Sequence, residues 1–376
     1  MRFADIPGHE DTKRRLREMV HSGRLPHALL LEGIGGVGKF ALARALAQYI
    51  HCSDRTPDGD SCGRCPACLQ HRGFNHIDTV YSFPVFKIDS KATFSDDYAR
   101  EFQEYMRDCV FADFSAWSGA IANGKTGQAS IFVDEASLLI ERVSHTAHSK
   151  GYKVVLMWLP ERLRPEAANR LLKLIEEPPD DTVFIMTSDR PGEILGTIYS
   201  RTQRVTVNRY TEDEIVGYLC AHAGADPAAA GAAAVLADGS MAAALQLLSV
   251  DKERAMFLEL FIRLMRLAWM RKIVPLREWS QEVAALGRDG SARFYGYCSR
   301  MLRENFILNV SGDNNLVTLT ADEAAFSSKF CPYVNERNIV QLIEAVDEAI
   351  RDTRLNGNAK IISFDLAVRA ILLLKR

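Results

Sequence analysis

The chain has 376 residues, of which 47% are hydrophobic, so it is long enough for two or three domains that each bury a core. Its 46 basic and 48 acidic side chains nearly balance, which excludes a strongly basic surface that would draw the whole chain to nucleic acid. No apolar run reaches the length of about 18 residues that suggests a membrane span, and the first residues lack the apolar core of a signal peptide. We therefore expect a cytoplasmic protein.

Strands and helices alternate in the first part of the chain, which indicates an α/β fold with a parallel sheet. The expected strands cover residues 28–31, 78–81, 153–157 and 182–187. The expected helices cover residues 9–22, 39–51, 133–150 and 165–175, and the last of them stops at a pair of prolines. A polar and aromatic insertion at 84–128, with a helix near 97–109, has no evident purpose. After Val207 the pattern is wholly helical.

A glycine-rich segment follows the first expected strand and opens the next helix. It has the Gly-x4-Gly-Lys spacing of a phosphate-binding loop, in which backbone N–H groups surround the β-phosphate and the lysine reaches the β and γ oxygens. The expected nucleotide-binding residues are Gly33, Gly35, Gly36, Gly38 and Lys39.

The residues that would hold magnesium at this loop are missing. The position after Lys39 should carry a hydroxyl as a metal ligand, but it is Phe40. The 153–157 strand should end in an acidic pair that binds the metal and polarises the attacking water, but it runs into Trp158 and Leu159. We expect no ATP hydrolysis by this chain, which indicates a structural or regulatory member of an ATPase assembly. Whether ATP or ADP still binds under Lys39 is left open.

Asp134 and Glu135 offer another position for an acidic pair, because they follow the short apolar segment Ile131–Val133. The pattern continues as a helix, however, and acidic residues are favoured at a helix N-terminus by the helix dipole. We interpret the two residues as the first turn of a helix, and the alternative of an active ATPase rests on them.

Four of the eight cysteines lie close together, at Cys52, Cys62, Cys65 and Cys68. Four thiolates at these spacings can supply a tetrahedral zinc site, and a site closed by four protein ligands is structural. An iron–sulfur cluster or a redox role is the alternative. The remaining cysteines are scattered, which is not a disulfide framework. We interpret the nearby His51, His71 and His76 as solvated loop histidines.

Together these motifs resemble the clamp-loader family of AAA+ proteins, and in particular its delta-prime branch in bacterial DNA polymerase III. The resemblance is strong over residues 1–207 and weaker beyond, where the ending Asn358–Ile362 is similar to the family's helical collar. It is carried by Leu25–Leu30, the four-cysteine module at 52–68, Glu166–Pro179, Thr187 and Ser200–Thr202.

The resemblance implies roles for single residues. In the family, an Ser-Arg-Cys motif places its arginine in the ATP site of the neighbouring subunit, where it stabilises charge on the γ-phosphate. Arg201 would be this catalytic residue in trans, with Thr202 in place of the cysteine; the plainer interpretation is a surface arginine after a strand. Thr187 takes the sensor position of the nucleotide site. Ala242 stands where ATP-hydrolysing relatives carry a phosphate-sensing arginine.

The resemblance also implies an architecture and partners. It predicts an AAA+ P-loop domain at 1–207, a helical lid domain at 208–250 and a helical collar domain at 251–376. The chain would be a non-hydrolysing subunit of a hetero-pentamer with gamma/tau and delta subunits, which loads a sliding clamp on primed DNA for the polymerase holoenzyme. Two alternatives are an active ATPase subunit of the gamma/tau kind and a zinc-stabilised adaptor with an inert P-loop fold.

Overall fold

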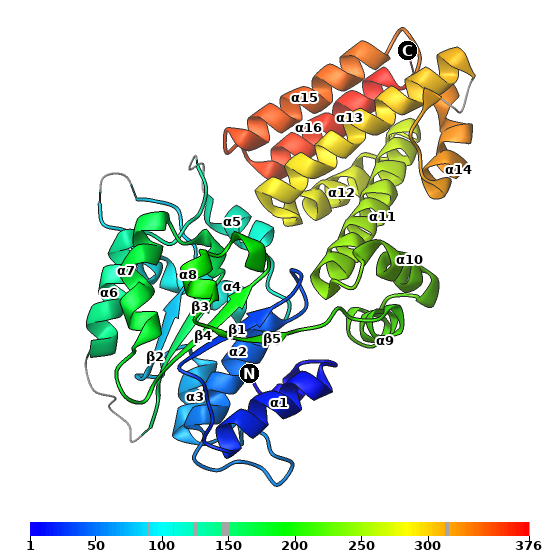
Figure 1. The fold of residues 1–376 in the computed structure, drawn as a ribbon. Helices are drawn as coiled ribbons and strands as arrows, with labels where there is room; N and C mark the ends of the chain where they lie inside the picture. The colour runs from blue at the N-terminus through cyan, green and yellow to red at the C-terminus, as the bar shows by residue number, and fades with distance from the viewer. Residues whose placement is uncertain (89–90, 108, 123–126, 145–150, 313–315, 376) are drawn as a thin grey trace. The chain divides into compact units, whose positions relative to one another are not determined.

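The computed structural model describes residues 1–88, 91–107, 109–122, 127–144, 151–312 and 316–375 (Figure 1). The chain divides into two compact units, Met1–Leu248 and Ser249–Arg376. One long helix, α11 (Met241–Trp269), contributes residues to both units. The predicted boundary at residue 250 falls inside this helix, and the division into three domains stays a prediction.

A five-stranded parallel sheet forms the centre of the first unit, in the order β2-β3-β4-β1-β5 (Figure 1). The strands are β1 (Ala28–Glu32), β2 (Thr79–Ser82), β3 (Lys153–Trp158), β4 (Thr182–Ser188) and β5 (Gln203–Thr206). The parallel α/β prediction is confirmed, and four strands lie where the sequence placed them. The fifth, β5, was not predicted, because it is an edge strand in which Val205 alone is buried.

Alternate side chains of the central strands enter two different cores, as the period of a strand requires. Leu29 and Leu31 of β1 face the side covered by α1 and α2, whereas Leu30 faces the side covered by α6 and α7. The strands are therefore buried on both faces, which explains their continuous apolar runs.

The helices of the first unit are α1 (Glu10–His21), α2 (Lys39–His51), α3 (Pro66–Arg72), α4 (Ala99–Met106), α5 (Phe114–Ala122), α6 (Val133–Ser144), α7 (Pro165–Glu176), α8 (Gly196–Tyr199), α9 (Glu212–Ala223) and α10 (Pro227–Ala237). Each predicted helix range of the first unit contains a helix, and α3, α5 and α8 were not predicted. The predicted helix at 133–150 is present to Ser144, and residues 145–150 lie outside the described part of the chain.

The 84–128 insertion packs over the sheet. Val85, near its start, forms an antiparallel bridge with Ser130, which lies just after its end. The helix predicted near 97–109 is found as the 3-10 turn Ser95–Tyr98 and α4, and its residue 108 lies outside the described part. Phe102 of α4 stacks on Phe83 with ring centroids 3.7 Å apart. The aromatic residues of the insertion therefore belong to the hydrophobic core. No role was predicted for this segment from the sequence.

In the described residues of the second unit, all regular secondary structure is helical. Its helices after α11 are α12 (Ile273–Ala285), α13 (Gly287–Ser311), α14 (Ala321–Phe330), α15 (Ile339–Arg354) and α16 (Ala359–Leu373). They share one apolar core, in which Trp279 is fully buried and donates its indole N–H to the carbonyl of Leu260 at 3.0 Å. Within the described residues, no helix combines the length and apolar character that crossing a bilayer requires.

Candidate functional site

The glycine loop between β1 and α2 has the backbone shape of a phosphate-binding loop, and its glycines are needed for it. Gly36 has a φ of 77°, and a Cβ there would lie 2.6 Å from Cβ of Ala242. A Cβ on Gly33 would lie 2.5 Å from the carbonyl oxygen of Val207. Neither position tolerates a side chain, because the backbone φ or a close neighbour excludes it.

The start of α11 packs directly on this loop. The hydroxyl of Ser240 donates to the carbonyl of Gly35 at 2.9 Å, and the N–H of Ala242 donates to the carbonyl of Gly36 at 3.2 Å. The chain thus brings Ala242 to the glycine loop, where it presents only a methyl group. A phosphate bound there would receive no positive charge from this position.

Lys39 is buried, and its ammonium group is held by partners within the chain. Its Nζ lies 2.7 Å from Oδ1 of Asp189 and also donates to the carbonyl of Ile34. Asp189 follows β4 and its backbone N–H donates to Oε1 of Glu161 at 2.8 Å. The carboxylate of Asp189 therefore supplies the negative charge that a nucleotide phosphate would otherwise bring to the loop lysine.

Asp189 and Glu161 were not predicted as site residues from the sequence. The available signal was an aspartate directly after a buried strand, at the edge where the carboxyl ends of parallel strands meet the glycine loop. The sequence offered no signal for Glu161, because it reaches the site from the 3-10 turn Pro160–Arg162 after β3.

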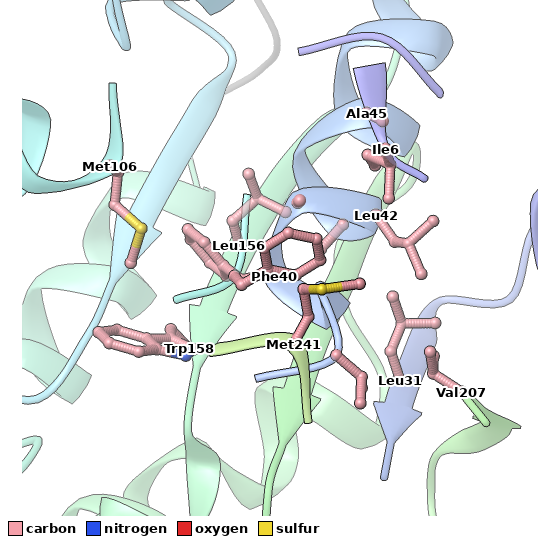
Figure 2. Packing of buried hydrophobic residues seen from close by; sticks show 14 of the residues in the cluster. Ile6, Leu31, Phe40, Leu42, Ala45, Met106, Leu156, Trp158, Val207 and Met241 are labelled. Atoms are coloured by element: carbon pink, nitrogen blue, oxygen red, sulfur yellow. The ribbon is translucent and has the colours of Figure 1, made fainter. Parts of the chain in front are cut away.

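Phe40 and Trp158 occupy the two positions where metal ligands would stand, and they contact each other. Their ring centroids are 5.8 Å apart, and Phe40 lies equally far from Phe102 in an edge-to-face arrangement. Figure 2 shows Phe40 between Leu156 and Met241 in this apolar cluster. Because both rings are buried and lack oxygen, these positions supply no ligand to magnesium and no base to activate water.

Thr187 lies at the end of β4, level with Leu31 of β1 and Trp158 of β3. Its side chain is buried, and among the described residues its hydroxyl finds no hydrogen-bond partner. The predicted sensor residue thus lies at the same edge of the sheet as the glycine loop, with an unused donor.

Asp134 and Glu135 lie in the first turn of α6, as the sequence analysis favoured. Oδ2 of Asp134 accepts from the N–H of Thr93 at 3.4 Å, and Oε2 of Glu135 accepts from the N–H of Ser95 at 2.9 Å. Burial raises the pKa of Glu135. These acids anchor the insertion, and the strand next to β4 is β3, which ends at Trp158.

The four clustered thiols are arranged as a tetrahedral metal site requires. All four Sγ atoms lie within 4.8 Å of one another, and those of Cys62 and Cys68 are 3.9 Å apart, close to the spacing of about 3.8 Å that zinc–sulfur bonds of ~2.3 Å produce. The N–H groups of Cys62 and Cys65 donate to Sγ of Cys52 and of Cys62, both at 3.3 Å. Burial raises the pKa of the Cys65 thiol, but hydrogen bonds with Cys68 and Ser53 outweigh it and lower that pKa. The site therefore fits zinc.

The three nearby histidines are not solvated loop residues, and that interpretation was wrong. His71 and His76 are buried, and Nδ1 of His51 lies 2.8 Å from Nε2 of His71. Burial and the neighbouring imidazoles lower the pKa of His71 to about 2 and that of His76 to about 4. All three rings are within 22° of parallel. The ring nitrogens available for ligation lie within 4.8 Å of one another, and the three histidines form a stacked, hydrogen-bonded cluster.

Arg201 lies between α8 and β5, so it precedes a strand and does not follow one as the plainer interpretation assumed. Gln203 is level with Leu29 of β1, and the glycine loop follows the other end of β1. Arg201 therefore lies at the amino ends of the strands, whereas the glycine loop lies at their carboxyl ends. With a rise of about 3.3 Å per strand residue, the two are roughly 20 Å apart.

The side chain of Arg201 is partly exposed and has two polar contacts. Its Nε lies 3.0 Å from Oε2 of Glu176 without the alignment of a hydrogen bond, and its Nη1 donates to the carbonyl of Thr197 at 2.9 Å. One third of the side chain remains exposed. Glu176 belongs to the Glu166–Pro179 segment, so two motifs that are distant in sequence meet here.

Comparisons with known proteins show which family the chain resembles. A family model described as DNA polymerase III, delta subunit, matches residues 8–211. The delta' subunit of Yersinia pestis is 31% identical over 190 residues, which cover 50% of this chain and 43% of that protein. The delta' subunit of Escherichia coli is 27% identical over 269 residues, covering 71% and 66%. The tau subunit of Bacillus subtilis is 27% identical over 218 residues, covering 58% and 31%.

The chain spans less than two thirds of the length of each of these relatives. The family match nevertheless covers more than half of the chain and includes the glycine loop, the four-cysteine module and Arg201. The chain belongs to the DNA polymerase III delta subunit family.

Proposed function

We propose that this chain is the non-hydrolysing, delta-prime-like subunit of a cytoplasmic DNA polymerase III clamp loader. It joins gamma/tau and delta subunits in a hetero-pentamer, and the ATP bound by those partners drives loading of the sliding clamp on primed DNA. The contact between Phe40 and Trp158 carries the proposal, because it replaces both metal-ligand positions with packed aromatic rings. Ala242 at the loop and the pairing of Lys39 with Asp189 support it further.

In this proposal Arg201 acts in trans on the ATP site of a neighbouring subunit. Its position at the far edge of the sheet supports this role, because the side chain cannot reach its own glycine loop. Partial exposure leaves the guanidinium accessible, and a planar fork of N–H donors suits a γ-phosphate on which charge develops. A finger that comes from another subunit makes hydrolysis depend on correct assembly.

The other parts of the chain have structural roles in the proposal. Helices of 208–250 form a lid whose last residues cover the glycine loop, and the helices of 251–376 form a collar that holds the pentamer. The four-cysteine module binds one zinc ion that stabilises the fold around α3. Cys65→Ser is expected to lose the bound metal, measured as zinc per chain, and a chain that retains one equivalent would contradict the four-thiolate assignment.

The deciding experiment measures the DNA-stimulated ATPase rate of the reconstituted complex with Arg201→Ala in this chain alone. We expect a fall of about 10³-fold or more, the scale of an arginine finger, while size-exclusion chromatography shows an intact complex. The matched control is Arg204→Ala, an exposed arginine of β5 whose guanidinium lies over Tyr199. An unchanged rate in an intact Arg201→Ala complex would leave the chain a scaffold.

The two alternatives give different results in the same system. If the chain is an active ATPase, Asp134→Asn abolishes its turnover, whereas we expect no effect because Asp134 binds the backbone of Thr93. If it is a zinc-stabilised adaptor outside replication, it does not co-purify with gamma/tau and delta subunits.

A further inference from the structure

One cavity of the first unit lies away from the glycine loop. It has a volume of about 700 Å³, which is in the range of small-molecule sites. Its walls come from the start of the chain, from α2, from the zinc-module helix α3 and from the insertion, so it forms only where these four segments meet. The lining residues used below are Asp5, Arg44, Leu69, Arg72, Arg107 and Val110.

Arg44 of α2 is a buried cation in this cavity. Only 5% of its surface is exposed, and burial lowers the pKa of its guanidinium. The group lies 4.1 Å from the centroid of the Phe74 ring, and its Nη1 donates to the carbonyl of Met106 at 2.8 Å. These partners position the guanidinium but do not neutralise its charge, and a buried charge without a counter-charge is costly.

Two further arginines face the same cavity from other elements. Arg72 ends α3, and its Nη2 donates to the carbonyl of Gly63 at 3.1 Å. Arg107 follows α4 of the insertion, and both side chains are exposed at the mouth. Within the described ranges, neither these arginines nor Arg44 form an ion pair with a carboxylate.

Asp5, the acid among the described residues that line the cavity, is already ion-paired. Oδ1 of Asp5 lies 3.0 Å from Nη2 of Arg2, and Oδ2 accepts from the backbone N–H of Arg2 at 2.7 Å. Among the described residues, three guanidinium groups therefore face the cavity without an ion-paired carboxylate, while Leu69 and Val110 supply apolar wall.

We propose that this cavity binds a small anion that carries a phosphate or pyrophosphate group, with Arg44, Arg72 and Arg107 as its ligands. Planar guanidinium groups from three elements match phosphate oxygens as paired donors. The site is independent of the proposed clamp-loader role and of the glycine loop, since Lys39 does not line it. A small anion is favoured over a nucleic-acid backbone, because the innermost arginine is almost fully buried and a polymer would have to pass the mouth to reach it.

The test is calorimetric titration of the full, zinc-loaded chain with inorganic pyrophosphate. It is done in the Lys39→Met background, which removes any binding at the glycine loop. We expect one site per chain, and we expect Arg72→Gln and Arg107→Gln each to weaken binding by about tenfold, the scale of one charge-assisted hydrogen bond. Arg44→Gln should weaken it further.

Arg100→Gln is the matched control, because it removes the same charge from the same inserted segment at a site that does not line the cavity. Since Arg72 and Arg107 are exposed, their variants keep the test valid if Arg44→Gln fails to fold. No binding to the Lys39→Met chain, or equal affinity of the arginine variants and the control, would overturn the proposal. So would binding of a 5′-phosphorylated oligonucleotide through these arginines without binding of pyrophosphate, which would make the cavity a nucleic-acid contact.

Discussion

The carboxyl and amino ends of the strands in the central sheet differ in the functional side chains that they carry. At the carboxyl edge of the strands, the glycine loop keeps its backbone shape, but Lys39 is paired with Asp189 and Phe40 is packed on Trp158. At the amino edge, Arg201 remains partly exposed and is held only by Glu176 and a backbone carbonyl. At the carboxyl ends of the strands, the glycine loop keeps its shape but lacks the side chains for hydrolysis. At their amino ends, Arg201 presents a guanidinium group that the chain's own glycine loop cannot use.

This difference shows that the shape and the chemistry of a phosphate loop are separable. The shape depends on glycines that are enclosed by Val207 and Ala242, so packing alone preserves it. Hydrolysis depends on a few oxygen-bearing side chains, and single substitutions remove them. The following variants test whether the two edges are as different as the structure indicates.

Among these further variants, the largest effect is expected from Arg201→Lys in the reconstituted complex. Lysine keeps the charge but loses the planar fork of donors, so the ATPase rate should fall by about 10²-fold, less than for Arg201→Ala. Steady-state ATP turnover measures it. If lysine restores the wild-type rate, Arg201 acts as a point charge and not as a finger.

At the carboxyl edge, Phe40→Ala should destabilise the first unit by about 3–5 kcal/mol, since it opens a cavity among Phe102, Trp158 and their neighbours. Chemical unfolding monitored by circular dichroism measures the loss. Phe40→Leu, which keeps most of the volume, is the control. A loss no greater than that of Phe40→Leu would mean that the ring is not a core residue, and the argument against a metal site would weaken.

The second unit also contains a buried carboxylate, Glu323, that is ion-paired with Arg254 and Arg300. Its effect on stability can be compared with that of the pair between Lys39 and Asp189. Burial raises the pKa of Glu323, but hydrogen bonds from Arg254, the backbone of Thr320, Arg300 and Tyr297 outweigh it and lower that pKa to about 2. Because the folded-state pKa is below the ordinary value of 4.5, this group stabilises the fold above pH 4.5, and the contribution is lost as pH falls toward 2.

Unfolding of the wild type and of Glu323→Gln should therefore converge in stability as pH falls through this window. Denaturant titrations at several pH values measure the difference. A gap between the two proteins that stays constant down to pH 2 would show that the carboxylate is not held as a charged group.

The smallest effect is expected for Lys39→Met in the reconstituted complex. The lysine is already neutralised within the chain, so the ATPase rate should change by less than about twofold while partners hydrolyse ATP. The same substitution in a gamma/tau subunit is the control and should lower the rate strongly. A comparable loss from this chain would indicate a working nucleotide site and favour the active-ATPase alternative.

The sequence by itself determined the parallel α/β class, four of the five strands and the two losses at the phosphate loop. These features are local: apolar runs of strand length, a glycine spacing, and the residue types at Phe40 and Trp158 are all visible in a short window. The cysteine spacing likewise predicted four thiols that the structure places within 4.8 Å of one another.

Only the tertiary structure decided which distant groups meet. The partnership of Lys39 with Asp189, the stacking of His51, His71 and His76, and the cavity at Arg44 each join segments that are far apart in the chain. The edge strand β5 was missed for a related reason, since one buried residue gives no periodic signal. Long-range pairing depends on topology and packing, and local propensity carries little information about it.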